Sequence, residues 1–198
     1  MFTIITTSNT KLGGSIAQVN MPYLLSCRPD APCSKECYCT HGNMAYDNVR
    51  QSHIKKYEMY KSNPVAFFNA IDNELNFIPF KYFRWHSSGD IVDMQYLDLM
   101  CKLARKHKET MFLCFTKKYE IINEYLNNHK KPNNLTIVLS TWKEWKPDNP
   151  HNLPISCVIE KEEDIPLYSY ECPGSCQDCN GQHCWHMKKG DVVSFHKH

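Results

Sequence analysis

The sequence lacks any apolar run of about 18 residues, the length that a membrane-spanning helix needs, so we expect no membrane segment. Residues 1–14 also lack the basic start, the long apolar stretch and the cleavage site of a secretory signal. The net charge is only +2. This weakens a nucleic-acid role without excluding it, because nucleic-acid binding normally uses a concentrated basic face. We therefore expect a cytoplasmic protein that does not contact a membrane.

Several familiar catalytic motifs are missing as well. The sequence has no Ser-His-Asp pattern, no H-E-x-x-H motif, no P-loop and no G-x-G-x-x-G motif. It also has no internal repeat, no low-complexity segment and no obvious linker. With 198 residues, of which 42% are hydrophobic, the chain is long enough to form one domain with its own core. We therefore interpret residues 1–198 as a single domain.

Cysteine, in contrast, is abundant, with 11 residues of this type. Cytoplasmic thiols stay reduced, so this pattern indicates metal binding or catalysis rather than disulfides. Eight of the cysteines lie in two groups, at 27–39 and 172–184. The other three, Cys101, Cys114 and Cys157, lie in apolar segments, and we predict that they are core residues, because a free cysteine packs as a small hydrophobe.

Hydrophobic periodicity and turn residues predict an alternation of strands and helices. We expect helices at 44–61, from Pro64 onward with Asn63 as its N-cap, at 93–107 with Asp93 as N-cap, and at 119–128. We expect strands at 21–27, 81–86, 111–118, 135–142, 155–161 and 192–198, with 165–170 as an optional further strand. Strands that are apolar on both faces, with helices between them, indicate a parallel sheet. The predicted fold is therefore α/β, with a parallel-rich open sheet or a partial (β/α) barrel that carries Cys-rich loops.

The C-terminal cysteine loop has the spacing C-x3-C-x2-C-x4-C, through Cys172, Cys176, Cys179 and Cys184. Four thiolates this close in sequence can reach one metal centre, and closely spaced cysteines of this kind bind [4Fe–4S] clusters. Structural zinc is the alternative, although zinc sites usually use two separated cysteine pairs. We therefore predict an iron–sulfur cluster at this loop, with zinc as the competing interpretation.

The N-terminal cysteine loop contains Cys27, Cys33, Cys37 and Cys39 with the spacing C-x5-C-x3-C-x-C. The last two are too close in sequence to bind one ion comfortably, so we predict Cys27, Cys33 and Cys37 as ligands. Three ligands would leave one iron of a second cluster open for chemistry. A second structural metal site, or one centre that shares ligands from both loops, is also compatible with the sequence.

The segment 81–90 offers candidate catalytic residues. Phe83 and Trp85 alternate with Arg84 and His86 along the predicted strand, and ligands bind at the carboxyl ends of parallel strands. We therefore predict Arg84, His86 and Asp90 near a substrate. Asp90, a substrate carboxylate or a cluster charge would neutralise Arg84. A structural Arg–Asp pair and a core histidine are the alternative.

The order of these motifs resembles the phage "gene product eighty-eight" family. The motifs are a Cys-rich loop, Phe-Arg-Trp-His-Ser-Ser-Gly-Asp at 83–90, a strand that ends in Phe-Thr-Lys, and a Cys-rich tail that ends in Cys-Trp. The resemblance covers most of residues 20–198, and Cys39 departs from the family pattern. The family positions fall on Cys27, Cys33, Cys37, Arg84, His86, Gly89, Asp90, Cys172, Cys176, Cys179, Cys184 and Trp185.

A second and weaker resemblance is to radical S-adenosylmethionine enzymes. The run from Cys33 through Cys37 to Cys39 is similar to their three-cysteine motif but one residue short. Ser88 and Gly89 stand where those enzymes have a glycine-rich motif. This resemblance implies S-adenosylmethionine as a cofactor, with Ser88 and Gly89 contacting it, on a partial barrel.

Three functional hypotheses follow. The first is an iron–sulfur enzyme of redox or radical type, with one or two [4Fe–4S] clusters and a small-molecule substrate. The second is a non-catalytic protein that transfers electrons to a redox partner or senses redox state. The third is a zinc-stabilised nucleic-acid-binding module that uses Trp142, Lys143, Trp145 and Lys146. If the chain is phage-encoded, the expected location is the host cytoplasm.

Overall fold

The computed structural model describes residues 3–7, 9–179 and 182–196. In these residues the strands form one seven-stranded sheet with the order β1-β2-β3-β4-β5-β7-β6, and all neighbouring strands are parallel. The strands are β1 (Ala17–Val19), β2 (Tyr82–Trp85), β3 (Met111–Thr116), β4 (Leu135–Thr141), β5 (Ile155–Ile159), β6 (Tyr170–Glu171) and β7 (Val192–His196). The helices are α1 (Asp47–Ser62), α2 (Pro64–Phe77), α3 (Met94–Lys106) and α4 (Tyr119–Asn128).

This architecture confirms the predicted α/β class and its parallel sheet. The open form applies, since β1 and β6 stand at the two edges. Two predicted helix starts are also confirmed. The side chain of Asn63 accepts a hydrogen bond from the Ala66 amide at 3.0 Å, and that of Asp93 accepts one from the Tyr96 amide at 2.9 Å. Each bond satisfies an amide that the helix itself leaves free.

Two predicted strands were wrong. Residues 21–27 form turns instead of a strand: Leu24 has a φ of 69° and is 60% exposed. The Met21 amide bonds to the carbonyl of Ser88, which fixes this segment on the loop after β2. At 165–170 the chain is extended enough for pairing only from Tyr170 onward, because Tyr168 has a φ of 65°. The predicted strand at 192–198 is present as β7, and its last two residues lie outside the described part.

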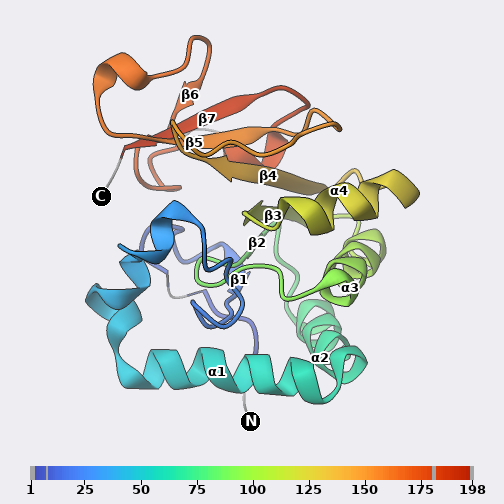
Figure 1. Ribbon diagram of the computed structural model, residues 1–198. Coiled ribbons are helices and arrows are strands. Elements are labelled where there is room, and N and C mark those ends of the chain that lie inside the picture. The colour runs from blue at the N-terminus through green and yellow to red at the C-terminus, as the bar shows by residue number, and fades with distance from the viewer. Residues whose placement is uncertain (1–2, 8, 180–181, 197–198) are drawn as a thin grey trace.

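The two faces of the sheet are covered differently. Helices α1 to α4 lie along one side, as Figure 1 shows, and their apolar residues pack with Phe83, Trp85 and Phe112 of the sheet. On the other face, Leu113, Phe115 and Val138 pack with Leu12, Trp185 and Met187, and with the partly buried Cys172, Cys176 and Cys184. The C-terminal cysteine loop therefore occupies the position that helices fill in a sheet covered by helices on both sides.

Trp185 fixes this loop on the sheet. Its ring is buried, with 1% exposed, and its Nε1 donates a hydrogen bond to the carbonyl of Phe83 at 3.1 Å. The Trp185 carbonyl in turn accepts a bond from Thr136 Oγ1 at 2.8 Å. Two strands are thus joined to one short 3₁₀ turn, His183–His186.

The three isolated cysteines lie in or beside the core. Cys101 and Cys114 are fully buried, while Cys157 is half-buried on β5. Among the described residues, no helix combines the length and the apolar character that crossing a membrane requires.

Candidate metal centres

The four thiols of the C-terminal group lie near one another. The pKa of Cys184 is raised to about 12, first by burial and then by the neighbouring thiols Cys172, Cys176 and Cys179, while the charge of Arg84 opposes the rise. Cys172 and Cys176 likewise have pKa values raised first by burial and then by other members of the group. The Tyr170 hydroxyl lies 3.4 Å from Cys179 Sγ. Every pair among the four thiols therefore interacts electrostatically, and the four form one group.

The N-terminal thiols neighbour one another in chain order, beside the ends of β2 and β3, and we call them the N-terminal row: Cys27, Cys33, Cys37 and Cys39. Cys39 is buried, and its thiol lies near Cys37, Ser88 and Tyr38. Interaction with Cys39 lowers the pKa of Cys37, since it stabilises the thiolate. Cys39 was left out of the predicted ligands because of its spacing from Cys37 and its departure from the family pattern. The structure places it beside one of them.

Cys27 and Cys33 lie at the other end of this row. The pKa of Cys27 is raised to about 11, first by burial and then by the carboxylate of Asp90, while the charge of Lys117 opposes the rise. Burial also raises the pKa of Cys33, and Lys117 again opposes the rise. The charge of Lys117, at the end of β3, therefore lies near these thiols.

Asp90 holds together the three chain segments next to the N-terminal row, which follow β1, β2 and β3. It is 1% exposed and accepts hydrogen bonds from Thr116 Oγ1 at 2.6 Å and from the Lys117 amide at 2.9 Å. Its own amide donates to Ser26 Oγ at 3.0 Å. Asp90 thus connects the ends of β2 and β3 through its carboxylate, and the segment after β1 through its amide. It does not pair with Arg84, which corrects one of the expected partners.

His86 lies on the helical side of the sheet and not beside Arg84. The expected alternation ends at this residue, because its φ is 58°. Its Nε2 lies 3.1 Å from the Tyr96 hydroxyl of α3, and its Nδ1 lies 3.9 Å from Cys114 Sγ. Burial, with a further contribution from the charge of Arg84, lowers the pKa of His86 to about 3, so the imidazole is neutral at pH 7. A catalytic role for it stays a prediction.

Ser88 and Gly89 shape the loop itself. Ser88 Oγ donates to the Met21 carbonyl at 3.0 Å, and the Ser88 amide donates to Asn20 Oδ1 at 3.1 Å. Gly89 has a φ of 81°, and a Cβ there would lie 2.6 Å from both the Met21 carbonyl oxygen and Ser26 Oγ. Only glycine fits this contact, so packing explains Gly89 directly, and its predicted cofactor contact stays a prediction.

Arg84 lies on the face that carries the C-terminal loop. Its guanidinium lies 4.6 Å from the centre of the Phe115 ring, in the same apolar cluster as Cys172, Cys176 and Cys184. In the described part of the chain no carboxylate pairs with this cation, and its Nε is buried without a hydrogen-bond partner. Arg84 is only partly buried, but a buried guanidinium nitrogen without a hydrogen-bond partner is unfavourable, so this environment favours an anion.

A comparison with protein-family models matches residues 3–197 to the gene product 88 model. The chain belongs to the gene product 88 family. Searches of the curated proteins and of the solved structures found no significant match. The family prediction is therefore confirmed, whereas the iron–sulfur character and the resemblance to radical S-adenosylmethionine enzymes stay predictions.

A single metal ion and a four-iron cluster place different demands on the spacing of the thiols. Within residues 3–7, 9–179 and 182–196, no three His, Cys, Asp or Glu side chains are close enough to hold one metal ion. A four-iron cluster binds each thiolate through a different iron, so its sulfurs stand further apart than the ligands of a single zinc ion. The four neighbouring C-terminal thiols and the unsatisfied Nε of Arg84 fit such an anionic cluster.

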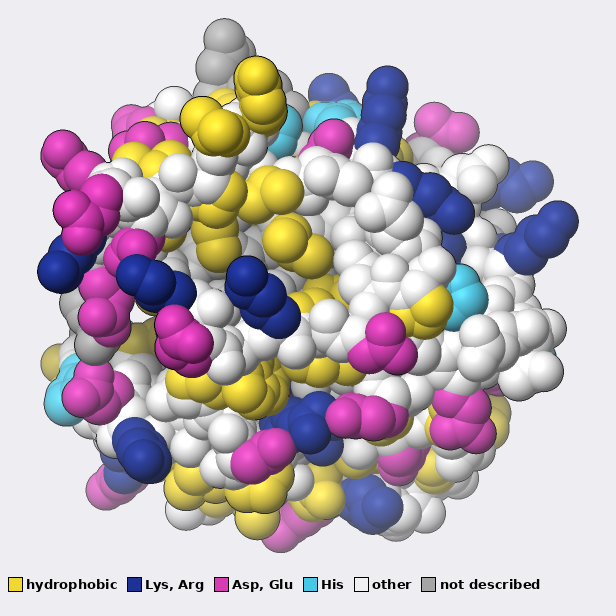
Figure 2. All heavy atoms as spheres, turned by 45° about the horizontal axis from the view of Figure 1, so that its top comes forward, with side chains coloured by type: hydrophobic (Ala, Val, Ile, Leu, Met, Phe, Trp, Pro, Cys, Tyr) yellow, Lys and Arg dark blue, Asp and Glu magenta, His cyan; other side chains and the backbone are white. Residues whose placement is uncertain are grey.

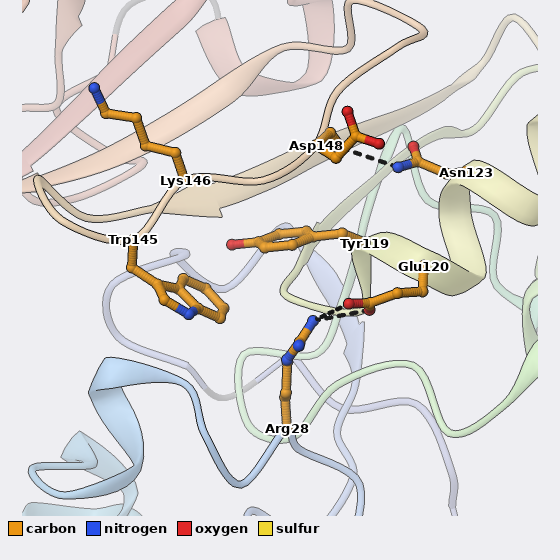
Figure 3. A pocket seen from close by; sticks show the side chains of 7 residues that line it. All are labelled: Arg28, Tyr119, Glu120, Asn123, Trp145, Lys146 and Asp148. Atoms are coloured by element: carbon orange, nitrogen blue, oxygen red, sulfur yellow. Dashed lines mark hydrogen bonds and ion pairs between the residues drawn. The ribbon is translucent and has the colours of Figure 1, made fainter.

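A cavity of about 340 Å³ lies elsewhere, at the start of α4. Figure 3 shows Arg28 beside Glu120, with the rings of Tyr119 and Trp145 close by. Arg28 bonds to both oxygens of Glu120, at 2.6 and 2.8 Å, and its charge is also neutralised by Asp30. The segment after β4 contributes Trp145, Lys146 and Asp148 to the wall, and the lining contains no cysteine. The cavity is lined by Arg28, Tyr119, Glu120, Asn123, Trp145, Lys146 and Asp148.

Sequence reasoning missed three residues that surround the thiols. Tyr38 and Tyr170 each place a hydroxyl against a cysteine, and Lys117 places a charge near the N-terminal row. Tyr38 stands between Cys37 and Cys39 in the sequence, which was a usable signal. Lys117 ends the Phe-Thr-Lys motif, which was a second usable signal, whereas nothing in the sequence around Tyr170 distinguishes it from an ordinary strand residue.

Proposed function

We propose that this protein binds [4Fe–4S] clusters at its two cysteine groups and acts as a redox or radical-type enzyme. The observation that carries the proposal is the C-terminal group, in which four thiols are neighbours of one another and of Arg84, whose Nε has no hydrogen-bond partner in the described part of the chain. Cys172, Cys176, Cys179 and Cys184 would hold one cluster. Cys27, Cys33 and Cys37 would hold a second.

The position of the N-terminal row supports its role as the reactive centre. It lies at the carboxyl ends of parallel strands, where α/β proteins bind their ligands, and Ser88 and Asp90 fix the loops beneath it. A bound cluster would supply one-electron transfer, and an open iron would supply a position for a small molecule. S-adenosylmethionine is our candidate for that molecule.

Electron transfer without catalysis is a second candidate, and the surface beside the row favours it. Leu24, Leu25 and Tyr38 are 60%, 59% and 55% exposed. Exposed apolar side chains that gather near a redox centre suit contact with a partner protein. Binding of S-adenosylmethionine, detected as a change in the electron paramagnetic resonance signal, would favour the enzyme. An unchanged signal with a reversible redox couple would favour the carrier.

The nucleic-acid module receives less support from the surface. Figure 2 shows Lys and Arg side chains intermingled with Asp and Glu on the face that it presents, with hydrophobic side chains between them. Lys143 pairs with Asp164 at 2.7 Å, and Lys117 lies 5.8 Å from the centre of the Trp142 ring. A nucleic-acid site would leave such cations free for phosphates.

The first experiment is to measure iron, zinc and acid-labile sulfide per chain in protein purified without oxygen. About eight irons with matching sulfide would indicate two four-iron clusters, and about four would indicate one. Zinc without sulfide would overturn the proposal. It would then leave the zinc-stabilised module as the hypothesis to test.

A further inference from the structure

The cavity at the start of α4 lies where three segments meet at the carboxyl ends of the strands. Tyr119 and Glu120 begin α4, shortly after β3 ends. Trp145 belongs to a tight turn after β4, in which its amide and carbonyl bond to Trp142 at 3.1 and 2.9 Å. Arg28 comes from the segment after β1. Parallel sheets bind ligands at this edge, and a volume of about 340 Å³ suits a small molecule.

Two aromatic rings form one side of this cavity. The rings of Tyr119 and Trp145 lie 5.1 Å apart, at an angle of 47°. Tyr119 is buried in the core, whereas Trp145 is only partly buried and can offer a ring face to a ligand. Figure 3 shows Arg28 beside both rings, with its guanidinium 5.8 Å from the centre of Tyr119 and 5.6 Å from that of Trp145. The cavity therefore offers a flat apolar surface for stacking.

Carboxylates supply the free charge of the lining. Arg28 is neutralised by Asp30 and Glu120, through bonds of 2.7 and 2.6 Å, and Glu120 is 70% exposed at its side chain. The side chain of Asp148 forms no ion pair within the described residues, although its backbone carbonyl accepts a bond at 2.9 Å. Lys146 also lines the cavity, but Figure 3 shows its ammonium pointing away from the rings. The lining is thus rich in hydrogen-bond acceptors.

These walls disfavour charged ligands of either sign. A cationic ligand would meet Arg28, which already lies over both rings. An anionic ligand would meet the carboxylates of Glu120 and Asp148. A neutral planar ring with N–H donors avoids both costs, because its face stacks on Trp145 and its N–H groups donate to the carboxylates.

We propose that this cavity binds a free molecule with a guanine ring, whose face packs on Trp145 and whose N–H edge donates to Glu120 and Asp148. Guanine carries two adjacent donors, at its N1 and its 2-amino group, which match the two oxygens of a carboxylate. Adenine lacks this pair, since its N1 is an acceptor. The acidic lining also disfavours the phosphates of a nucleic-acid strand. The inference goes beyond the proposed function, because it involves no cysteine and no cluster.

The test is equilibrium dialysis of the full chain against guanosine, up to about 1 mM. The wild-type chain should bind one guanosine, and adenosine should bind about tenfold more weakly, which is the discrimination that paired hydrogen bonds to a base give. Trp145→Leu should weaken guanosine binding about tenfold, because stacking is lost. Trp145→Phe keeps a ring and should retain most of the binding, and it shows whether the cavity survives a change at this position.

Two further variants sharpen the test. Trp142→Leu is the matched control, since this ring lies 5.6 Å from that of Trp145 but does not line the cavity. It should bind guanosine as tightly as the wild type. Asp148→Asn removes one acceptor oxygen and should reduce the preference for guanosine over adenosine.

The outcomes are decisive in both directions. Absence of guanosine binding to the wild-type chain, equal binding by Trp145→Leu, or equal affinity for adenosine would overturn the inference. Tighter binding of a short single strand that contains one guanine would overturn the assignment to a free molecule. Iron and sulfide are measured in the same samples, so a chain without them that still binds guanosine would overturn only the proposed function.

Discussion

The C-terminal loop packs its thiols against an apolar face of the sheet, whereas the N-terminal loop holds its thiols above the polar strand ends. Cys172, Cys176 and Cys184 are neighbours of Phe115 and Trp185 in one hydrophobic cluster. The N-terminal row instead lies near hydrogen-bonding groups at the carboxyl ends of β2 and β3, such as Ser88, Asp90 and Thr116. Removing the C-terminal group would therefore open the core, while removing the N-terminal row would open a surface. The same residue type is thus expected to serve stability in one loop and chemistry in the other.

The largest expected effect comes from Cys179→Ala, compared with Cys33→Ala. Metal binding is coupled to folding where the ligands close the core. Cys179→Ala should lose the iron of the C-terminal centre and about 3 kcal/mol of stability, a fall of about 10 °C in Tm. Cys33→Ala should lose the N-terminal iron with a much smaller fall. Iron analysis and thermal unfolding measure both. Unchanged iron content and Tm in Cys179→Ala would contradict the comparison.

Gly89→Ala tests the N-terminal side without changing a thiol. The new Cβ would meet the Met21 carbonyl oxygen and Ser26 Oγ at 2.6 Å, at a φ of 81°. We expect a loss of about 2–3 kcal/mol in denaturant unfolding, together with loss of the N-terminal iron and retention of the C-terminal iron. Gly14→Ala is the control, since a Cβ there meets nothing within 4 Å. Equal stability of the two variants would show that the loop around Gly89 can move away from Met21 and Ser26 to make room for the new Cβ.

Acid should act through His86. Its pKa is lowered from 6.5 to about 3 in the folded protein, so between these values the unfolded chain binds a proton that the native chain does not. Stability from this group is therefore present above pH 6.5 and falls as the pH falls toward 3. Between pH 7 and 5 the loss is about 2 kcal/mol by linkage. His86→Asn, in which asparagine tolerates the positive φ, should reduce the pH dependence of denaturant unfolding by this amount. An unchanged dependence would show that the pKa of His86 is not lowered in the native state.

The smallest expected effect comes from Trp185→Phe. This change removes the hydrogen bond from Nε1 to the Phe83 carbonyl, which is 3.1 Å long, but keeps an aromatic ring in the cluster. We expect a loss of about 1 kcal/mol and faster release of iron from the C-terminal centre only. Iron release to a chelator, followed over time, measures the difference. Faster release from the N-terminal centre would indicate that the loops depend on each other.

Much of the fold could be predicted from local signals. Asn63 and Asp93 were recognisable as N-caps, and the buried residues of 119–128 recur with helical spacing. Residues 21–27 misled the prediction, because an apolar run resembles a buried strand until its exposure is known. Leu24 and Leu25 lie on the surface instead. The sequence shows which residues are apolar, but not which of them are buried against other parts of the chain.

The sequence by itself determined the family, the α/β class and the two groups of four cysteines, because periodicity and spacing are local properties. Only the tertiary structure decided the surroundings of the thiols. The positive φ of His86 turns it toward Tyr96, and Asp90 bonds to Thr116 and Lys117 instead of Arg84. These contacts join strands that are distant in sequence. Their partners are set by the order and register of the sheet, which no local pattern contains.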